Sequence, residues 1–291
     1  MLSVADIRAY FKLLPHQKIV SYFHETQFSY PLKKGENFDI QYGLNDISTA
    51  MASDFCLFNS NYHKNQFLKD IKFYLKKMPD FQPLWIKDQI NQKSSVIYPC
   101  CELSTTVFIK PTNTPLKILY NHRWEHDKNP EEFFNSIFKL SQEGFNFDLY
   151  ILGESYKNIP EIFSKAQTIL QKHIKQFGYV KSLDNYYSIL KQCDFVVSTS
   201  LQENYGISVI EAMNYGCIGL LPDRLSYPEL LPTHLKSKFI YSDLYIALKE
   251  MFKMSNIKKS KYSNSFIEAM QKYSTKNLVN ELDNFFEKIK L

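Results

Sequence analysis

The sequence has no long hydrophobic run, few arginines and no closely paired cysteines. Its longest apolar stretches, such as IGLLP and FVV, fall far short of the roughly 20 residues that a membrane-spanning helix needs. No charged and then apolar leader opens the chain. We therefore expect a soluble protein that has no membrane partner.

The five cysteines form neither a CxxC pair nor an even, closely spaced set. This pattern predicts reduced thiols in a cytoplasmic protein and argues against a zinc site. Only three of the 35 basic residues are arginines, a bias that we attribute to nucleotide composition, and the net charge of +5 is modest. Lysine runs are therefore weak evidence for nucleic acid here, whereas each arginine is informative.

With 291 residues, of which 44% are apolar, the chain can bury one large core or two ordinary ones. From about residue 117 onward, strand and helix patterns alternate, which predicts a doubly wound parallel sheet. The expected strands are 116–121, 147–153, 194–200 and 217–222. The expected helices are 129–144, 159–178, 182–193 and 206–216, with Pro130 in one first turn and glycines at three ends, Gly144, Gly178 and Gly216.

The first hundred residues follow a shorter version of the same plan. Strands are expected at 18–25 and 54–60, and helices around 3–13, 41–52 and 62–78. The stretch STTVFIKPTNTP, residues 104–115, has the composition of a linker. We therefore predict an α/β protein with two Rossmann-like domains and a cleft between them. The domains are residues 1–110, and residues 111–291 with helices at the carboxyl end.

Glycine is scarce in the first domain, where Gly35 and Gly43 are the only two before residue 110. A doubly wound nucleotide-binding domain normally opens with a strand and a glycine-rich turn that leads into its first helix. The amino-terminal domain is therefore expected to be short.

Ligands bind beyond the carboxyl ends of the strands in open parallel sheets, and three polar clusters follow expected strands. They are FHETQ after Tyr22, HRWEHDK after Asn121 and QENYG after Ser200. In the second cluster, His122, Glu125 and His126 fit the HxxEH spacing of one class of zinc peptidases. That spacing requires a helix, whereas this segment lies between a strand and a helix start.

The same cluster places two cations, Arg123 and Lys128, on a strand-to-helix loop. A planar guanidinium together with a point-charge ammonium suits a diphosphate. A solvated loop, in which Glu125 and Asp127 pair with the two cations, explains the same residues equally well.

Glu203 and Glu211 lie on either side of Gly206, where the chain turns from strand into helix. Amides at the helix start would face an anion, and Glu211 would accept hydrogen bonds from a ribose diol. Glu203 would lie near a sugar attached to the diphosphate. For an isolated pair of glutamates, two solvent-exposed positions are the alternative.

Residues 64–93 hold seven lysines against three aspartates. Lys69, Lys72 and Lys76 share one face of the expected helix, while its apolar residues share another. This basic face is either a solvated helix surface or a surface that tracks phosphates.

The glutamate pair, the central glycine and the ending EAMNYG resemble the donor-site motif of the family 4-like glycosyltransferases, which have the B-type fold of two Rossmann domains. Longer stretches look more narrowly like the tRNA-queuosine alpha-mannosyltransferases: YFHETQFSYP, FNSNYH, NHRWEHDKNPEEFF, FGYVKSLDNYYSILKQCDFVVST and PDRLSYPELLP. The resemblance runs from about residue 2 to residue 245. It implies a retaining glycosyltransferase that moves a mannosyl group from GDP-mannose to queuosine in a tRNA.

The resemblance also implies roles for single residues. Arg123 and Lys128 would bind the donor diphosphate, Glu203 and Glu211 would contact the transferred sugar and the ribose, and His24 would face the reacting sugar. The implied catalytic residues are His24, Arg123, Lys128 and Glu203. The implied donor site comprises Arg123, Lys128, Gly178, Tyr179, Glu203, Tyr205, Gly206 and Glu211. The implied acceptor side comprises Glu25, Gln27 and Tyr30.

The chain offers no obvious protein nucleophile and no DxD pair to hold a metal. This agrees with the metal-independent, retaining chemistry that the resemblance implies, in which the leaving phosphate itself takes the acceptor proton. No metal or cofactor other than the sugar nucleotide is therefore expected. Fixed cations and amides would lower the barrier, because charge builds on the leaving phosphate as the glycosyl centre gains oxocarbenium character.

The chain departs from the family pattern in two ways. Thr26 stands where family members usually have Asn, and Gln202, Asn204 and Tyr205 interrupt a usual HEFFG sequence; we expect these changes at the rim of the site. Relatives also carry a further strand and a GGSH-type loop before the position that matches Met1, so the first domain is expected to be incomplete. The alternatives are the same fold acting on a glycan or lipid, or an inactive remnant that binds nucleotide or tRNA.

Overall fold

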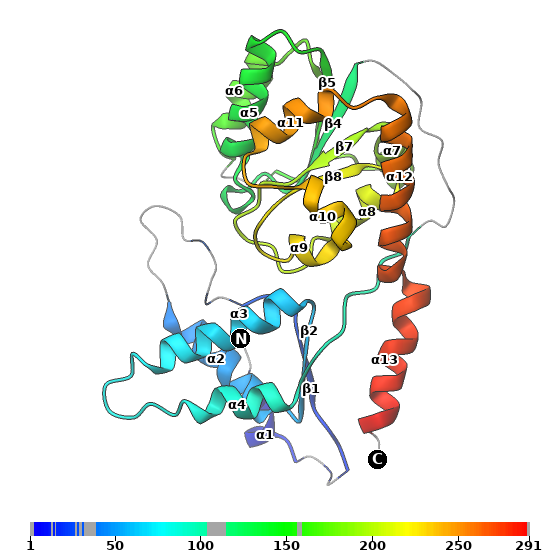
Figure 1. The fold of residues 1–291 in the computed structure, drawn as a ribbon. Coiled ribbons are helices and arrows are strands. Elements are labelled where there is room, and N and C mark those ends of the chain that lie inside the picture. The colour runs from blue at the N-terminus through cyan, green and yellow to red at the C-terminus, as the bar shows by residue number, and fades with distance from the viewer. Residues whose placement is uncertain are drawn as a thin grey trace. The chain divides into compact units, whose positions relative to one another are not determined.

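The computed structural model describes residues 3–12, 14, 16–26, 28, 31, 39–103, 115–155 and 159–289 (Figure 1). The chain forms two compact units: unit 1 contains Met1–Cys100 and Leu278–Leu291, and unit 2 contains Cys101–Asn277. The expected linker, residues 104–115, lies outside the described residues except for Pro115. The segment from Leu278 groups with unit 1, whereas the sequence pattern places it in the second domain.

Unit 1 contains a three-stranded parallel sheet in the order β1-β2-β3. β1 (Val20–Phe23) and β2 (Phe55–Phe58) confirm the two expected strands, and β3 (Ser94–Val96) is not predicted by the sequence pattern. Helices are also found where they were expected. The helices of unit 1 are α1 (Val4–Tyr10), α2 (Ile40–Ala52), α3 (Asn61–Leu75), α4 (Trp85–Gln92) and, from Leu278 onward, α13 (Thr275–Ile289).

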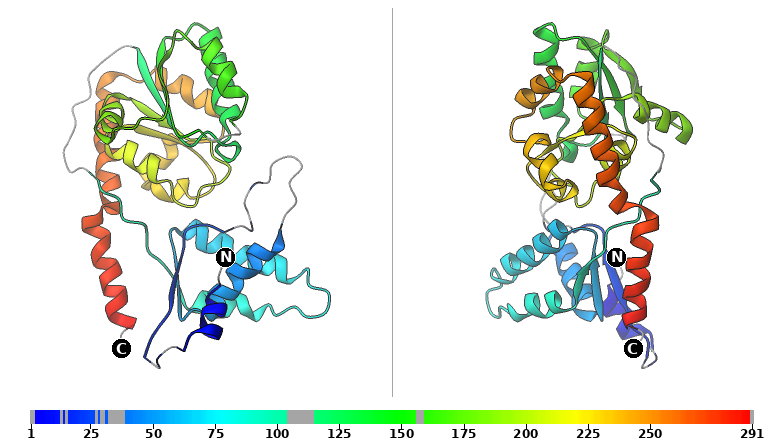
Figure 2. Two further views of the ribbon diagram at one scale, coloured as in Figure 1. Left: turned by 180° about the vertical axis from the view of Figure 1, so that it is seen from behind. Right: turned by 45° about the vertical axis from the view of Figure 1, so that its right-hand side comes forward.

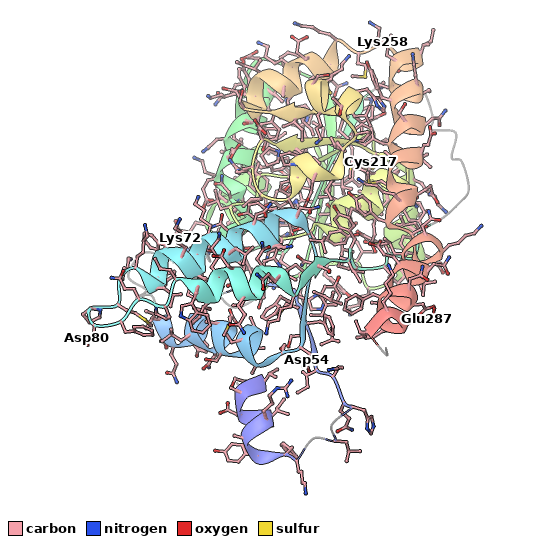
Figure 3. All side chains as sticks on the ribbon, turned by 60° about the horizontal axis from the view of Figure 1, so that its bottom comes forward. Asp54, Lys72, Asp80, Cys217, Lys258 and Glu287 are labelled. Carbon is pink, nitrogen blue, oxygen red and sulfur yellow. The ribbon has the colours of Figure 1, made fainter. Side chains whose placement is uncertain are left out.

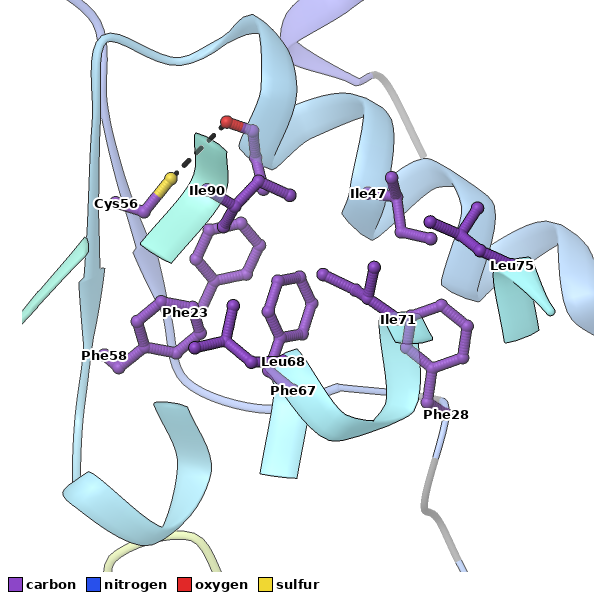
Figure 4. Close-up of a cluster of buried hydrophobic side chains, with 11 residues drawn as sticks. Phe23, Phe28, Ile47, Cys56, Phe58, Phe67, Leu68, Ile71, Leu75 and Ile90 are labelled. Carbon is purple, nitrogen blue, oxygen red and sulfur yellow. Dashed lines mark hydrogen bonds between the residues drawn. The ribbon is translucent and has the colours of Figure 1, made fainter. Parts of the chain in front are cut away.

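The core of unit 1 lies between its sheet and the apolar face of α3. Ser60 caps α3 by accepting a hydrogen bond from the amide of His63 at 3.0 Å. Phe67 and Ile71, one helical turn apart, are fully buried, and Phe67 packs against Phe58 of β2 with ring centroids 5.3 Å apart (Figure 4). Burying a side chain of this size contributes roughly 1.5–3 kcal/mol, so this face of α3 is committed to the core.

Unit 2 contains a six-stranded parallel sheet in the order β6-β5-β4-β7-β8-β9. Central strands such as β4 and β5 are buried on both faces, which is why they appear as continuous apolar runs in the sequence. The strands are β4 (Leu116–Asn121), β5 (Phe147–Leu152), β6 (Ile174–Gly178), β7 (Phe195–Val197), β8 (Ile218–Pro222) and β9 (Ile240–Tyr241).

Helices cover both faces of this sheet, as expected for a doubly wound fold. α5, α6 and α11 pack together on one face, and α8 and α12 pack together on the other (Figure 1). The α-helices of unit 2 are α5 (Pro130–Gln142), α6 (Ile162–Ile169), α7 (Leu183–Gln192), α8 (Ile207–Asn214), α9 (Tyr227–Leu230), α10 (Thr233–Phe239), α11 (Leu244–Phe252) and α12 (Asn256–Met270). Two short 3-10 helices are η1 (His126–Lys128) and η2 (Gln271–Tyr273).

The expected long helix over residues 159–178 is wrong. α6 ends at Ile169, and the chain then turns and forms the edge strand β6. The turn is fixed by His173, whose ring stacks on Phe147 with centroids 4.0 Å apart and whose Nδ1 lies 2.9 Å from the Phe147 carbonyl oxygen. Pairing with β5 therefore overrides the local helical pattern, an outcome that depends on residues distant in the sequence.

The carboxyl-terminal part of unit 2 closes over one face of the sheet. α12 packs against α8 and β8 (Figure 2), and the Ser263 hydroxyl donates to the carbonyl oxygen of Gly216 at 2.8 Å. None of the helices in the described part of the chain has the length and apolarity that crossing a bilayer requires.

Candidate active site

The switch point of the unit 2 sheet lies between β4 and β7, because β5 and β6 extend the sheet on one side of β4 while β7, β8 and β9 extend it on the other. Ligands of doubly wound sheets bind in the crevice at this point. The loops after β4 and β7 both begin there and bond to each other. The Leu201 amide donates to the Asp127 carbonyl at 2.7 Å, and the Thr199 hydroxyl donates to the Lys128 carbonyl at 2.8 Å.

Lys128 is the cation at the centre of these two loops, and only 8% of it is exposed. Its Nζ donates to the carbonyl oxygen of Gln202 at 2.9 Å and lies 3.2 Å from Asp127 Oδ2 and 3.5 Å from Glu203 Oε2. The alternative prediction of an ion pair with Asp127 is therefore confirmed. Its other part, that the loop is solvated, is wrong for Lys128, because this side chain is buried. A charge held by three oxygens from two loops is fixed in position before any ligand binds.

Arg123 differs from Lys128 because 52% of its side chain is exposed. Its Nη2 lies 3.3 Å from Glu125 Oε2. A surface ion pair of this kind stabilises the protein by roughly 0–1 kcal/mol. Arg123 can therefore leave Glu125 and bind a phosphate at a small cost in free energy. The loop after β4 therefore presents one buried cation and one accessible cation.

The loop after β7 turns into α8 at Gly206, whose φ of 97° lies in the left-handed region that favours glycine. The preceding Glu203 is tied to this turn, because its Oε1 accepts a hydrogen bond from the amide of Tyr205 at 3.3 Å. α8 begins at Ile207, and the first amides of a helix have no acceptor within it. Glu203 and the start of α8 thus lie on the same turn.

Glu211 lies one turn into α8 and belongs to a partly buried hydrogen-bonded chain. The Tyr186 hydroxyl donates to Glu211 Oε2 at 3.2 Å, and Asn121 Nδ2 donates to the Tyr186 oxygen at 3.3 Å and to the Ser208 carbonyl at 2.8 Å. Burial raises the pKa of Glu211, and the hydrogen bond from Tyr186 partly offsets this rise. The chain connects the end of β4 to α7 and α8.

A cavity of about 240 Å³ opens beside this chain, at the carboxyl ends of β4, β5 and β6. Its lining is mixed: apolar side chains and aromatic rings surround two charged groups. The residues of the lining that matter here are Asn121, Arg123, Gly153, Glu154, Tyr179 and Tyr186. Tyr179, which is 64% exposed, follows Gly178, whose φ is 109°. The cavity therefore lies between the accessible cation Arg123 and the partly buried hydrogen-bonded chain that ends at Glu211.

Gly153 is required where β5 leaves the sheet. A Cβ on this residue would lie 1.9 Å from the carbonyl oxygen of His122, and its φ is 142°. The backbones that follow β4 and β5 therefore approach more closely than any side chain would allow. This approach shapes one wall of the cavity.

His122 is a buried residue of the loop after β4. Burial lowers its pKa to about 3, with a further contribution from the charge of Lys128, and its imidazole bonds to the backbone of Val197. His122 lies before the 3-10 turn η1 that begins at His126, so the two histidines do not share a helix as the HxxEH motif requires. Among the described residues, no group of three His, Cys, Asp or Glu side chains is placed to hold a metal ion.

In unit 1, His24 and Glu25 directly follow β1 and are exposed. The carbonyl oxygen of His24 accepts a hydrogen bond from Asn59 Nδ2 at 2.8 Å, which joins the ends of β1 and β2. The other two expected acceptor-side residues, Gln27 and Tyr30, lie outside the described residues.

The departures from the family pattern were expected at the rim of the site, and this is wrong. Gln202, Asn204 and Tyr205 are 7%, 8% and 3% exposed, and Thr26 is 1% exposed. Tyr205 packs edge-on against Tyr273 with centroids 5.7 Å apart, and the Gln202 carbonyl binds Lys128. A sequence motif at a strand end does not show which of its side chains turn inward.

Three residues of the site are not found from the sequence alone: Asn121, Gly153 and Tyr186. Asn121 and Gly153 end or follow predicted strands, and that position is the only signal that marks them. Tyr186 carries no signal, because its role depends on the packing of α7 against α8.

Comparison with known proteins identifies the family. The tRNA-queuosine alpha-mannosyltransferase N-terminal family model matches residues 1–101, and the model of glycosyl transferases group 1 matches residues 106–242. A tRNA-queuosine alpha-mannosyltransferase of Drosophila melanogaster is 30% identical over 304 residues, which cover 99% of this chain and 79% of that protein. The chain belongs to the tRNA-queuosine alpha-mannosyltransferase family. It is a glycosyltransferase, as the resemblance implied.

Solved structures confirm the B-type glycosyltransferase fold of this family member. Sucrose-phosphate synthase from Thermosynechococcus elongatus superposes with a TM-score of 0.71 at 12% identity, over 97% of this chain and 69% of that chain. The Anabaena protein HepE in complex with UDP and glucose gives 0.66 at 13% identity, over 92% of this chain and 71% of that chain. At such identities the similarity concerns the fold alone.

Proposed function

We propose that the chain transfers a mannosyl group, with retention of configuration, from GDP-mannose to queuosine in a tRNA. Support comes from membership of the tRNA-queuosine alpha-mannosyltransferase family. The observation that carries the proposal is the geometry at the switch point, where buried Lys128 is held 3.5 Å from Glu203. A cation and a carboxylate fixed together suit a ligand with an anionic phosphate next to a hydroxyl-rich sugar.

We assign the donor diphosphate to Arg123, Lys128 and the amide end of α8. Charge develops on the leaving phosphate during transfer, and fixed cations in a partly buried site stabilise it most. Glu203 would then accept hydrogen bonds from the mannosyl hydroxyls. His24 and Glu25 of unit 1 are proposed to contact the reacting sugar and the acceptor.

We assign the nucleoside to Glu211 and to the cavity beside it. Glu211 would accept hydrogen bonds from the ribose diol, and Tyr179 offers an exposed aromatic face on which a base can stack. Glu154 lines the same cavity, and a carboxylate there complements the N1–H and N2–H donors of guanine. Glu154→Gln should therefore weaken GDP more than UDP in competition titrations; equal losses would remove the guanine assignment.

The transfer balances without a protein nucleophile. The bond between the mannosyl carbon and the phosphate oxygen breaks, the acceptor hydroxyl forms a new bond to that carbon, and its proton passes to the leaving phosphate. No metal is proposed for this step. We also propose a cytoplasmic location, since all five cysteines lie in the described part of the chain and none of them forms a disulfide.

Incubation of the purified chain with GDP-mannose and queuosine-containing tRNA, followed by nucleoside mass spectrometry, tests the proposal. The expected product is queuosine with one added hexose. The same tRNA without queuosine, and UDP-glucose in place of GDP-mannose, serve as controls. The absence of the product in a preparation that is folded and binds GDP would overturn the proposed acceptor or the activity.

A further inference from the structure

One stretch of unit 1 is rich in lysine. Residues 64–93 carry seven lysines and three aspartates, an excess of four positive charges. A stretch of unit 2, residues 232–261, holds as many lysines, so the arrangement of the side chains and not their number distinguishes the stretch in unit 1. The stretch covers most of α3, the loop after it and all of α4.

Two lysines of α3 and the lysine that follows its last residue share one exposed face. Lys69, Lys72 and Lys76 are spaced three and four residues apart, so they lie on one side of the helix, and all three are exposed. Lys77 extends the row at the end of the helix and is exposed as well. We call these four residues the basic face; Figure 3 shows Lys72 pointing outward from α3.

Three exposed aromatic rings lie at the carboxyl end of the basic face. Phe73, Phe81 and Trp85 are 54%, 69% and 56% exposed, and we call them the aromatic end. Lys77 Nζ lies 4.0 Å from the centroid of the Phe73 ring. Gln82 Nε2 donates to the carbonyl oxygens of Lys76 and Met78 at 3.0 and 3.1 Å, which folds the loop that carries Phe81 back onto the end of α3.

The amino end of α3 lies beside the proposed acceptor-side residue His24. Asn59 joins them, since its Nδ2 donates to the His24 carbonyl at 2.8 Å and its Oδ1 lies 2.9 Å from His63 Nδ1 in the first turn of α3. The 15 residues of α3 span about 22 Å at 1.5 Å per residue. The basic face thus leads from His24 along the helix to the aromatic end.

We propose that the basic face and the aromatic end together bind the RNA of the acceptor. Lysine ammonium groups neutralise backbone phosphates, and exposed rings stack on unpaired bases. One surface that carries both in succession fits a strand whose bases are not all paired. The proposal rests on the proposed function, because it supposes that the acceptor is a tRNA.

An anionic membrane offers a similar charge but fits the surface less well. A helix that lies in a membrane interface buries its apolar face in the lipid. The apolar face of α3 is already committed to the core of unit 1 through Phe67, Ile71 and Leu75. The exposed rings gather at one end only and do not run along the lysine row.

Fluorescence anisotropy with labelled queuosine-containing tRNA tests the surface on the full chain. Lys69→Gln/Lys72→Gln/Lys76→Gln should weaken binding about tenfold or more at low salt. It should also reduce the slope of log affinity against log salt by about 2 to 3, because each phosphate contact contributes about 0.7–0.9. Phe73→Leu/Trp85→Leu should weaken binding about tenfold or more without changing this slope.

The matched control is Lys253→Gln/Lys258→Gln/Lys261→Gln, which removes three exposed lysines from unit 2 and should bind like the wild type. Equal losses of tRNA affinity in both triple variants would overturn the proposed binding surface, because affinity would then depend on net charge alone. Cosedimentation with phosphatidylserine vesicles that depends on the basic face, with tRNA affinity unchanged, would also overturn it.

Kinetics separates this proposal from the proposed function. The α3 triple variant should raise the KM for tRNA about tenfold and leave the KM for GDP-mannose unchanged. If the wild type makes mannosylated queuosine and the variant keeps its KM for tRNA, the surface alone is wrong. If the wild type makes no such product, the proposed function is wrong.

Discussion

The side chain of Lys128 is held by a backbone carbonyl and two carboxylates before any substrate is present. Burying an ammonium costs free energy unless its partners are well placed. Asp127, which is 1% exposed, supplies such a partner but depends on Lys128 in turn. Stability and the proposed donor binding are therefore coupled at this one residue, and substitutions can separate them.

Lys128→Met should lower kcat about 10²- to 10³-fold, the usual effect of removing one fixed group that stabilises developing charge. It should also cost about 3–5 kcal/mol of stability, because the buried Asp127 carboxylate loses its cation. Asp127→Asn/Lys128→Met should regain most of that stability and stay inactive. Urea denaturation and steady-state kinetics measure the two effects; an active double variant would contradict the role of Lys128.

The charge of Glu211, unlike that of Lys128, is expected to destabilise the folded state, because burial raises the pKa of Glu211. The folded state then binds the Glu211 proton more tightly than the unfolded state, so this residue's contribution to stability falls as pH rises above about 4.3, the ordinary glutamate value. Glu211→Gln removes the charge and keeps an acceptor for Tyr186.

In the absence of nucleotide, we expect Glu211→Gln to melt at a higher temperature than the wild type at pH 7. The difference should shrink toward zero as pH falls below about 4, where Glu211 is protonated in both the folded and the unfolded state. The same substitution should weaken GDP binding about tenfold or more, because hydrogen bonds to a charged acceptor are roughly twice as strong as neutral ones. If the variant is less stable than the wild type at pH 7, the negative charge of Glu211 does not destabilise the folded state.

At the scale of elements, the sequence predicts those strands and helices whose formation depends on neighbouring residues in the chain. β4, β5, β7 and β8 were predicted because buried parallel strands leave apolar runs, and α5 because Pro130 and Gly144 mark its ends. β6 and the three-residue β3 were missed, since each is a strand only through pairing with a neighbour. The carboxyl-end loops were predicted to form the site, but the burial of Lys128 and the hydrogen bond of Tyr186 to Glu211 depend on tertiary packing.

The close approach of the loops after β4 and β5 can be tested at Gly153. Gly153→Ala should cost roughly 3 kcal/mol or more and weaken GDP binding, because its Cβ would meet the His122 carbonyl oxygen at 1.9 Å. Gly144→Ala is the control: its φ is 81°, but no atom lies within 4 Å of the added Cβ. It should cost only about 1–2 kcal/mol of backbone strain and leave GDP binding intact. If both substitutions change stability and GDP binding equally, backbone strain explains the glycine at position 153, and the close approach to the His122 carbonyl oxygen does not.

At the scale of the whole molecule, the residues proposed for the two substrates lie in different units. The residues assigned to the donor nucleotide lie in unit 2, whereas the basic face, the aromatic end and His24 lie in unit 1. A ligand stabilises the unit that it binds by an amount set by its concentration relative to its Kd. GDP and tRNA should therefore protect different parts of the chain.

Hydrogen exchange followed by mass spectrometry measures this division. GDP at 100 times its Kd should slow those amides of unit 2 that exchange through unfolding of the unit by about 100-fold, which corresponds to about 2.7 kcal/mol. Residues 61–92 of unit 1 should not change with GDP. Queuosine-containing tRNA should instead slow exchange in the last turn of α3 and in residues 77–85. Equal protection of both units by GDP would contradict the division, because a ligand confined to unit 2 has no direct contact through which to stabilise unit 1.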